Sequence, residues 1–221
     1  IHQSRDQLFA QALSLICLTQ LDSPAHEKWL NSLRIYGDYL KGLMKWTAPY
    51  AMVPSGVYKI DEYEDEYSFN HLHIFAPEDA KDRFVTQLHK GVRIDDEYYI
   101  RRFPAWFNIY NGNNAIILST GKAAALCGKV LKDNDLLQIG LEQLYWTVGK
   151  NPFNQSMIFG EGWNYPQMNS FSSGELTGEI PVGIRSIDDE DSPYFPNANN
   201  ACYKEVWVSS AARALSLIAE F

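Results

Sequence analysis

The sequence predicts an all-α fold, and three observations support this class. Apolar residues recur with the 3.6-residue period of a helix in a series of long segments. Long loops rich in glycine, proline, asparagine and aromatic residues separate these segments, and no segment sustains the alternation of a strand. Because 46% of the 221 residues are hydrophobic, the chain can bury a substantial core. We therefore expect a single helical domain over residues 1–221.

Two helical hairpins and a closing helix account for the periodic segments. The first hairpin joins a helix from Gln3 to Leu21 to a second from about Pro24 to Ala48. The second joins a helix from Ala115 to Lys132 to one that starts at Asp133-Asn134-Asp135 and runs to Gly149. A last helix is expected from near Tyr203 to the end of the chain.

Local signals mark the ends and contacts of the second hairpin. Asn113-Asn114 can cap its first helix, and small residues such as Ala124 and Gly128 allow close helix contact. Gly149 and Pro152 stop its second helix, since proline disfavours helix at the residue before it.

Two long loop regions are expected, at residues 49–112 and 150–202. A short strand fits Val57 to Ile60, and Asp79 and Asp82 after Pro77 suit a first helical turn. The aromatic content of these regions argues against disorder, so we expect functional surfaces there.

Charge and hydropathy exclude several classes of partner. With 27 acidic and 19 basic residues the net charge is −8, which disfavours binding to nucleic acid. No apolar run approaches the roughly 20 residues that span a bilayer, so no membrane insertion is expected. Three widely spaced cysteines predict neither a disulfide framework nor a zinc site.

Two blocks in the C-terminal half carry the functional signal. The first, Tyr145 to Ser156, combines the end of a helix with Asn151-Pro152. The second, Tyr203 to Trp207, holds a lone carboxylate, Glu205, after a long polar and aromatic loop. Rings that shield a carboxylate from water favour the protonated form that a general acid needs.

These blocks resemble the C-terminal part of glycoside hydrolase family 9, an α/α six-hairpin barrel. Tyr145 to Gly162 is similar to the family's Tyr-x-Leu-Gly-x-Asn-Pro pattern, with Ser156 and Phe159-Gly160 following. Asn200 to Phe221 is similar to its Tyr-x-x-Asn-Glu-Val block, which places Glu205 on the general acid. The match covers about the last 110 residues, and the rest only as helix pattern. It implies hydrolysis of an oligo- or polysaccharide.

The resemblance also implies a larger protein. Such a barrel needs about twelve helices, so this chain would form its C-terminal portion, with an upstream part of the same protein supplying the rest. Tyr165-Pro166-Gln167-Met168 stands where the family has Pro-His-His-Arg, and Lys204 replaces the asparagine before the acid. Enzymes of this kind are commonly exported, which implies a periplasmic or secreted location.

The catalytic base is not identified. An inverting glycosidase needs a second carboxylate to activate water. The family's Asp-x-x-Asp spacing occurs at Asp79/Asp82 and at Asp188/Asp191, without the family's surrounding residues. Glu205 could instead only stabilise a helix dipole. The acidic runs at 61–66 and 188–191 are expected to be solvated, with structural calcium as the alternative and no other cofactor.

Substrate contacts are expected from loop aromatics, which can stack on sugar rings or else form a small core under the loops. Arg101 could clamp a uronic acid carboxylate, or pair with the nearby Asp95, Asp96 and Glu97. A metal at His71 and His73 lacks a third ligand. The candidate substrate-binding residues are Trp106, Tyr110, Trp163, Tyr165, Arg101 and Tyr203.

Two other functions stay open. The same fold could bind carbohydrate without cleaving it. It could also be a polysaccharide lyase on a related helical toroid, in which Tyr67 or His71 would act as base near Arg101.

Overall fold

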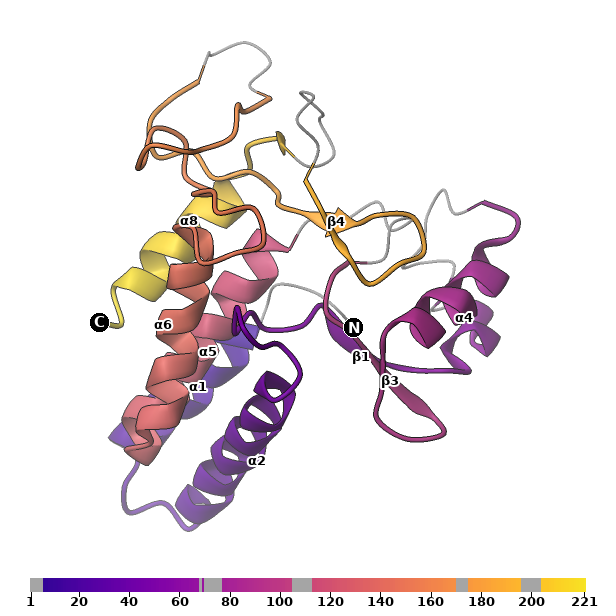
Figure 1. The fold of residues 1–221 in the computed structure, drawn as a ribbon. Helices are drawn as coiled ribbons and strands as arrows, with labels where there is room; N and C mark the ends of the chain where they lie inside the picture. Colours follow the sequence, from indigo (N-terminus) through magenta and orange to yellow (C-terminus); the bar gives the residue numbers. More distant parts are fainter. Residues whose placement is uncertain (1–5, 68, 70–76, 105–112, 170–174, 196–203) are drawn as a thin grey trace. The chain divides into compact units, whose positions relative to one another are not determined.

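The computed structural model describes residues 6–67, 69, 77–104, 113–169, 175–195 and 204–221 (Figure 1). The chain divides into two compact units. The helical unit comprises Ile1–Val53, Ala115–Asn151 and Val208–Phe221, and the mixed unit comprises Pro54–Asn114 and Pro152–Trp207. About half of the structure is helical, in six helices among the described residues, with few strands, which is compatible with the all-α class. The single domain stays a prediction.

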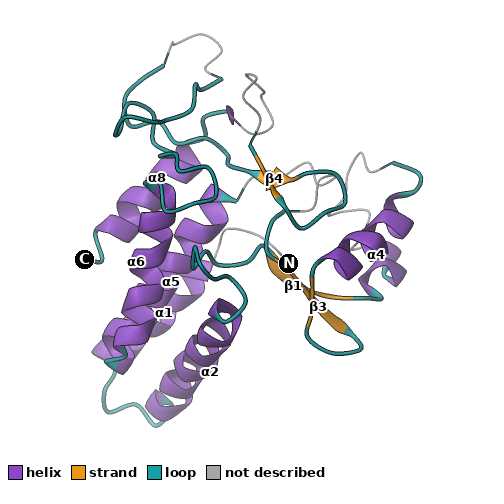
Figure 2. Cartoon of the chain, viewed as in Figure 1, coloured by secondary structure: helices purple, strands orange, loops and turns teal. Residues whose placement is uncertain are grey.

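The helical unit contains the predicted hairpins (Figure 2). α1 packs on α2, α2 on α6, and α6 on α8. The last helix begins at Val208 rather than near Tyr203, because Glu205 and Val206 form bridges to other segments. No helix among the described residues is long and apolar enough to cross a membrane. The helices are α1 (Asp6–Thr19), α2 (His26–Met44), α5 (Asn114–Leu131), α6 (Asn134–Thr147) and α8 (Val208–Ile218).

Helix α5 is buried along most of its length because small residues let its neighbours approach. A Cβ on Gly121 would lie 2.9 Å from a methyl of Leu217 in α8 and 3.0 Å from Cγ of Gln143 in α6. A Cβ on Gly128 would lie 2.9 Å from Cγ of Leu137. The predicted close helix contact is therefore confirmed.

The ends of α6 follow the sequence signals. The Asp133 carboxylate accepts hydrogen bonds from the backbone N–H groups of Asp135 and Leu136, at 3.0 and 3.3 Å. It also accepts one from Lys41 Nζ of α2 at 2.8 Å, which joins the two hairpins. At the other end Gly149 has a φ of 126°, a conformation that favours glycine.

The mixed unit contains a three-stranded antiparallel sheet in the order β1-β3-β2. Helix α4 (Ala80–Lys90) packs on β2 and β3. β1 confirms the predicted short strand. The rest of residues 49–112 was expected to be a loop region with one helical turn, so strands β2 and β3 were not predicted. The strands are β1 (Gly56–Lys59), β2 (Val92–Arg93), β3 (Tyr98–Arg101) and, in a separate pair, β4 (Arg185–Ser186) and β5 (Pro193–Tyr194).

Aromatic side chains form the core between this sheet and α4. Phe84 of α4 contacts Tyr58 of β1 edge to face, with ring centroids 6.1 Å apart, and Phe69 in the same way at 5.6 Å. Ala80, Leu88 and Tyr99 are the other buried members of this cluster. The sequence did not predict β2 and β3, because segments of two to four residues are too short to show the apolar–polar alternation of a strand.

Asp133 provides a test of the helix cap. Asp133→Ala should lower the free energy of unfolding by about 1 kcal/mol, whereas Asp133→Asn should keep most of the cap. The hydrogen bond from Lys41 lowers the pKa of Asp133. The contribution of the Asp133 charge to the free energy of unfolding is therefore complete above about pH 4, the pKa of an aspartate in the unfolded chain. It is lost as the pH falls through the lower pKa of the folded protein. Urea titrations from pH 3 to 7 should show wild type and Asp133→Asn converging at low pH; a constant difference would contradict this.

Candidate functional site

The backbone around Glu205 is held between two other segments of the mixed unit. Asn169 N–H donates to the carbonyl of Lys204 at 2.9 Å, and Val182 N–H donates to the carbonyl of Glu205 at 2.9 Å. Bridges pair Asn169 with Glu205 and Pro181 with Val206. Residues 205–206 are therefore extended rather than the first turn of a helix.

Among the described residues, the Glu205 carboxylate has one hydrogen-bond partner. Its Oε2 accepts a hydrogen bond from Nε1 of Trp207 at 2.7 Å. Side chains two apart in an extended segment lie on the same side, so the indole can orient the carboxylate. Glu205 is half-buried and Trp207 is exposed, which leaves the carboxylate near the surface. Sequence reasoning did not single out Trp207 as this partner, although its i+2 spacing could have shown it.

Lys204, beside Glu205, points into the protein. Its residue is 2% exposed, and its ammonium lies 5.4 Å from the centroid of the Phe195 ring. Burial lowers the pKa of Lys204, against the opposing effect of the Glu175 carboxylate. A buried lysine thus directly precedes the candidate acid in the chain.

Two of the candidate sugar-binding aromatics lie on a loop at the surface. Trp163 is 84% exposed, and Tyr165 is 39% exposed with its ring edge to face with Phe159, centroids 5.1 Å apart. Phe159 N–H donates to the Glu179 carbonyl at 2.9 Å, and Gly178 N–H donates back to Phe159. The loop is therefore attached to residues 178–179, shortly before Pro181, which forms a bridge to Val206. Trp106, Tyr110 and Tyr203 lie outside the described residues.

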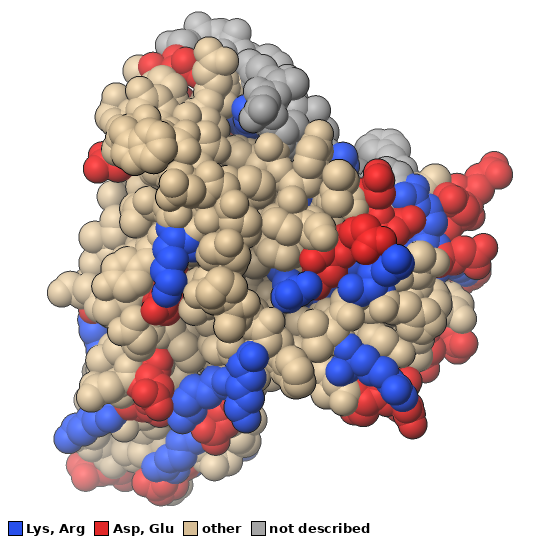
Figure 3. Space-filling view, in the orientation of Figure 1, with Lys and Arg blue, Asp and Glu red and all other residues tan. Residues whose placement is uncertain are grey.

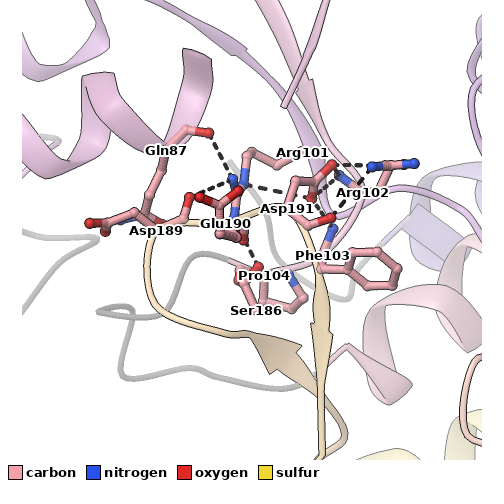
Figure 4. Close-up of polar contacts among 9 residues, drawn as sticks. All are labelled: Gln87, Arg101, Arg102, Phe103, Pro104, Ser186, Asp189, Glu190 and Asp191. Carbon is pink, nitrogen blue, oxygen red and sulfur yellow. Dashed lines mark hydrogen bonds and ion pairs between the residues drawn. The ribbon is translucent and has the colours of Figure 1, made fainter. Parts of the chain in front are cut away.

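Arg101 is buried rather than placed to bind a substrate. Its residue is 1% exposed, and its guanidinium donates to the carbonyls of Gln87 at 2.7 Å and Glu190 at 2.8 Å (Figure 4). It also donates to Ser186 Oγ at 2.8 Å, which donates onward to the Pro104 carbonyl. Arg101 is thus a structural arginine, but its partners come from residues 186–191 and α4, not from Asp95, Asp96 or Glu97.

Asp191 contradicts the expectation that the run 188–191 is solvated. Its side chain is 1% exposed and lies against Arg101, with Nε of Arg101 3.8 Å from Oδ1. It accepts hydrogen bonds from the N–H groups of Arg102 and Phe103 at 3.0 Å and from Nε of Arg102 at 2.8 Å. Since these donors occupy the carboxylate, the Asp188/Asp191 spacing does not place Asp191 at an open water site. Asp188 itself is exposed, as expected.

Two acidic residues of the run 61–66 are in surface ion pairs. Asp61 pairs with Lys59 at 2.9 Å and Glu66 with Lys81 at 3.0 Å. Burial raises the pKa of Glu62. No group of three or more His, Cys, Asp or Glu that could hold a metal occurs among the described residues. Asp79 and Asp82 begin α4 as expected.

The residues of the lyase alternative are not brought together in the described part of the chain. Tyr67 is exposed, whereas Arg101 is buried. His71, and with it the His71/His73 pair, lies outside the described residues.

Comparisons with protein-family models, with curated proteins and with solved structures found no significant match.

Asp191 should matter for stability more than its neighbours. Asp191→Asn removes the charge that compensates Arg101 and should lower the free energy of unfolding by about 3 kcal/mol. The matched control is the exposed Asp188→Asn, which should change it by about 0.5 kcal/mol or less. Urea titration of both variants measures the difference. Equal effects would show that the buried pair does not stabilise the protein.

Proposed function

We propose that this chain belongs to a glycoside hydrolase that cleaves an oligo- or polysaccharide by acid/base hydrolysis, with Glu205 as general acid. The observation that supports this best is the half-buried Glu205 carboxylate, which the Trp207 indole holds at 2.7 Å. A general acid must be fixed in direction and yet reach the leaving oxygen. The indole engages Oε2, which leaves Oε1 for the glycosidic oxygen.

The exposed aromatics supply a substrate surface for the same unit. Trp163 and Tyr165 present ring faces on which the C–H groups of a sugar can stack. Arg101 is not part of this proposal, because its donors are engaged in the interior.

The proposed fold is an α/α six-hairpin barrel. The α1–α2 and α5–α6 hairpins and the closing helix α8 suit such a barrel. The catalytic base and the remaining helices would come from an upstream part of the same protein, because Asp191 is occupied by Arg102 and Phe103. The base would lie roughly 6.5–9.5 Å from Glu205 in an inverting enzyme.

The proposed function also implies a partner, a location and a cofactor requirement. A carbohydrate is the partner, and neither nucleic acid nor a membrane is expected with a net charge of −8. Figure 3 shows acidic and basic side chains interspersed on the face drawn. We place the protein in the periplasm or outside the cell, where polysaccharides occur. The proposed reaction requires no cofactor; a structural calcium ion is the alternative, which calcium titration tests.

Replacing Glu205 tests the acid. In the complete protein, Glu205→Gln should lower the rate of glycan hydrolysis by about 10²–10⁴-fold, because the amide cannot donate the proton. Release of reducing ends measures the rate. Glu161→Gln, an exposed glutamate in the same unit, is the matched control and should leave it unchanged. An unaffected rate in Glu205→Gln would remove Glu205 from the mechanism.

The occupied Asp191 favours a second candidate, a protein that binds carbohydrate without cleaving it. Both candidates expect Trp163 to contact sugar, so Trp163→Ala should weaken glycan binding by about 10-fold or more, as for loss of a stacked ring. Tyr98→Ala, another exposed ring in the same unit, is the control. Isothermal titration with oligosaccharides measures affinity. Binding without released product favours the second candidate, and equal affinities of both variants would exclude Trp163 from the site.

A further inference from the structure

A short segment at residues 181–184, which we call the bridging segment, lies between Glu205 and Asn114 in the mixed unit. Val182 N–H donates to the Glu205 carbonyl at 2.9 Å, and the Val182 carbonyl accepts from Asn114 N–H at 3.1 Å. One residue thus forms backbone hydrogen bonds to both neighbours. A displacement on the Asn114 side therefore reaches the Glu205 side.

Two buried side chains hold the bridging segment in place. The Asn114 amide donates to the Pro181 carbonyl at 3.0 Å, and Asn113 Oδ1 accepts from Ile184 N–H at 3.3 Å. Both asparagines are 1% exposed or less, and Ile184 is fully buried. Because water does not reach these groups, breaking one of the bonds would leave a buried polar atom without a partner.

Gly183 of the bridging segment has no room for a side chain. A Cβ there would lie 2.8 Å from the Asn113 nitrogen and 2.9 Å from the Asn114 nitrogen, closer than real Cβ atoms approach other heavy atoms. Both nitrogens belong to the backbone, so they cannot rotate away. The φ of Gly183, 124°, is also a conformation that favours glycine. An alanine here would therefore displace the bridging segment from residues 113–114.

The direction of the Glu205 carboxylate depends on the bridging segment. Pro181 pairs with Val206, so the segment lies beside the backbone that carries both Glu205 and Trp207. The Trp207 indole in turn donates to Oε2 of the carboxylate at 2.7 Å. A shift of the bridging segment moves this backbone, and with it the angle at which the indole meets the carboxylate.

The second backbone contact of this region does not replace that support. Asn169 N–H donates to the Lys204 carbonyl at 2.9 Å, one residue before Glu205. With this contact alone the run 204–207 would be held at one end, and Glu205 could rotate about it.

We propose that Gly183 and Asn114 are positioning residues for Glu205. Both are buried, so neither is placed to contact a substrate. Asn114 holds the bridging segment, Gly183 lets it lie close, and the segment sets the direction of the carboxylate. The catalytic consequence rests on the proposed function, whereas the effect on the Glu205–Trp207 hydrogen bond does not.

The Trp207 indole N–H provides a direct test, because it is the donor to Glu205. In the complete protein labelled with ¹⁵N-tryptophan, its NMR signal is the one missing from Trp207→Phe. Gly183→Ala should move this signal, since a displaced carboxylate changes the shielding of the donated proton. The matched control is Gly178→Ala. Gly178 has a φ of 98° but nothing within 4 Å of its Cβ position, so this variant adds strain without a clash and should leave the signal in place.

Asn114→Ala is the second variant, which decides the question where Gly183→Ala does not fold. It removes the bond to the Pro181 carbonyl and keeps the backbone bond to Val182, so it should also move the Trp207 signal. In both variants kcat for glycan hydrolysis should fall about 10- to 100-fold with KM changed less than about 2-fold, because the acid is displaced and the substrate surface is not.

An unmoved Trp207 signal in a folded variant would overturn the role of the residue changed, as would an equal shift in Gly178→Ala. A moved signal with unchanged kcat would remove the catalytic part of the proposal. Wild-type protein that hydrolyses no glycan would instead remove the proposed function. The shifted signal would then still establish Gly183 and Asn114 as determinants of the Glu205–Trp207 hydrogen bond.

Discussion

The mixed unit depends on the buried pair of Arg101 and Asp191. Two charges removed from water need hydrogen bonds to their donors and acceptors. The terminal nitrogens of Arg101 donate to the Gln87 carbonyl in α4 and to Ser186 Oγ, and Asp191 accepts from the N–H groups of Arg102 and Phe103, which follow β3. Nε of Arg101 has no hydrogen-bond partner among the described residues and lies 3.8 Å from Oδ1 of Asp191. The pair therefore joins helix α4, strand β3 and the turn at residues 186–191. These directional hydrogen bonds fix the relative positions of the three segments more closely than an apolar contact between two residues would.

The local part of this architecture could be predicted from the sequence. Apolar periodicity located α1, α2, α5 and α6 to within a few residues, and Asp133 and Gly149 marked the ends of α6. These signals lie within a few residues of the structure that they determine, so one sequence is enough to detect them.

The non-local part could not be predicted. Arg101 and Asp191 are 90 positions apart, since 191 − 101 = 90, and nothing in either local pattern identifies the other as partner. The acidic run 188–191 looks like a solvated loop by composition alone, because burial of Asp191 depends on Arg101 at the end of β3 and on Arg102 directly after it. Strand β3 was not predicted for the same reason. It is stabilised by pairing with β1, and its own four residues do not show this partner.

The position of Glu205 follows from the same kind of long-range pairing. Residues 181–184 lie between Asn114, whose N–H donates to the Val182 carbonyl at 3.1 Å, and Glu205, whose carbonyl accepts from Val182. Gly183 permits this close approach, because a Cβ there would lie 2.8 Å from the Asn113 nitrogen, and its φ of 124° suits glycine. The sequence singled out Glu205 as a candidate but did not predict the segments that hold it.

This support bears on the proposed chemistry. A carboxylate on a helix would move with the helix, whereas Glu205 is held by backbone bonds on both sides and by one side-chain donor, Trp207. Rigid placement of the proton donor is what acid catalysis requires, since small displacements of a catalytic group weaken it strongly. Asn113 and Asn114, expected only as caps of α5, hold the same segment: Ile184 N–H donates to Asn113 Oδ1, and the Asn114 amide donates to the Pro181 carbonyl.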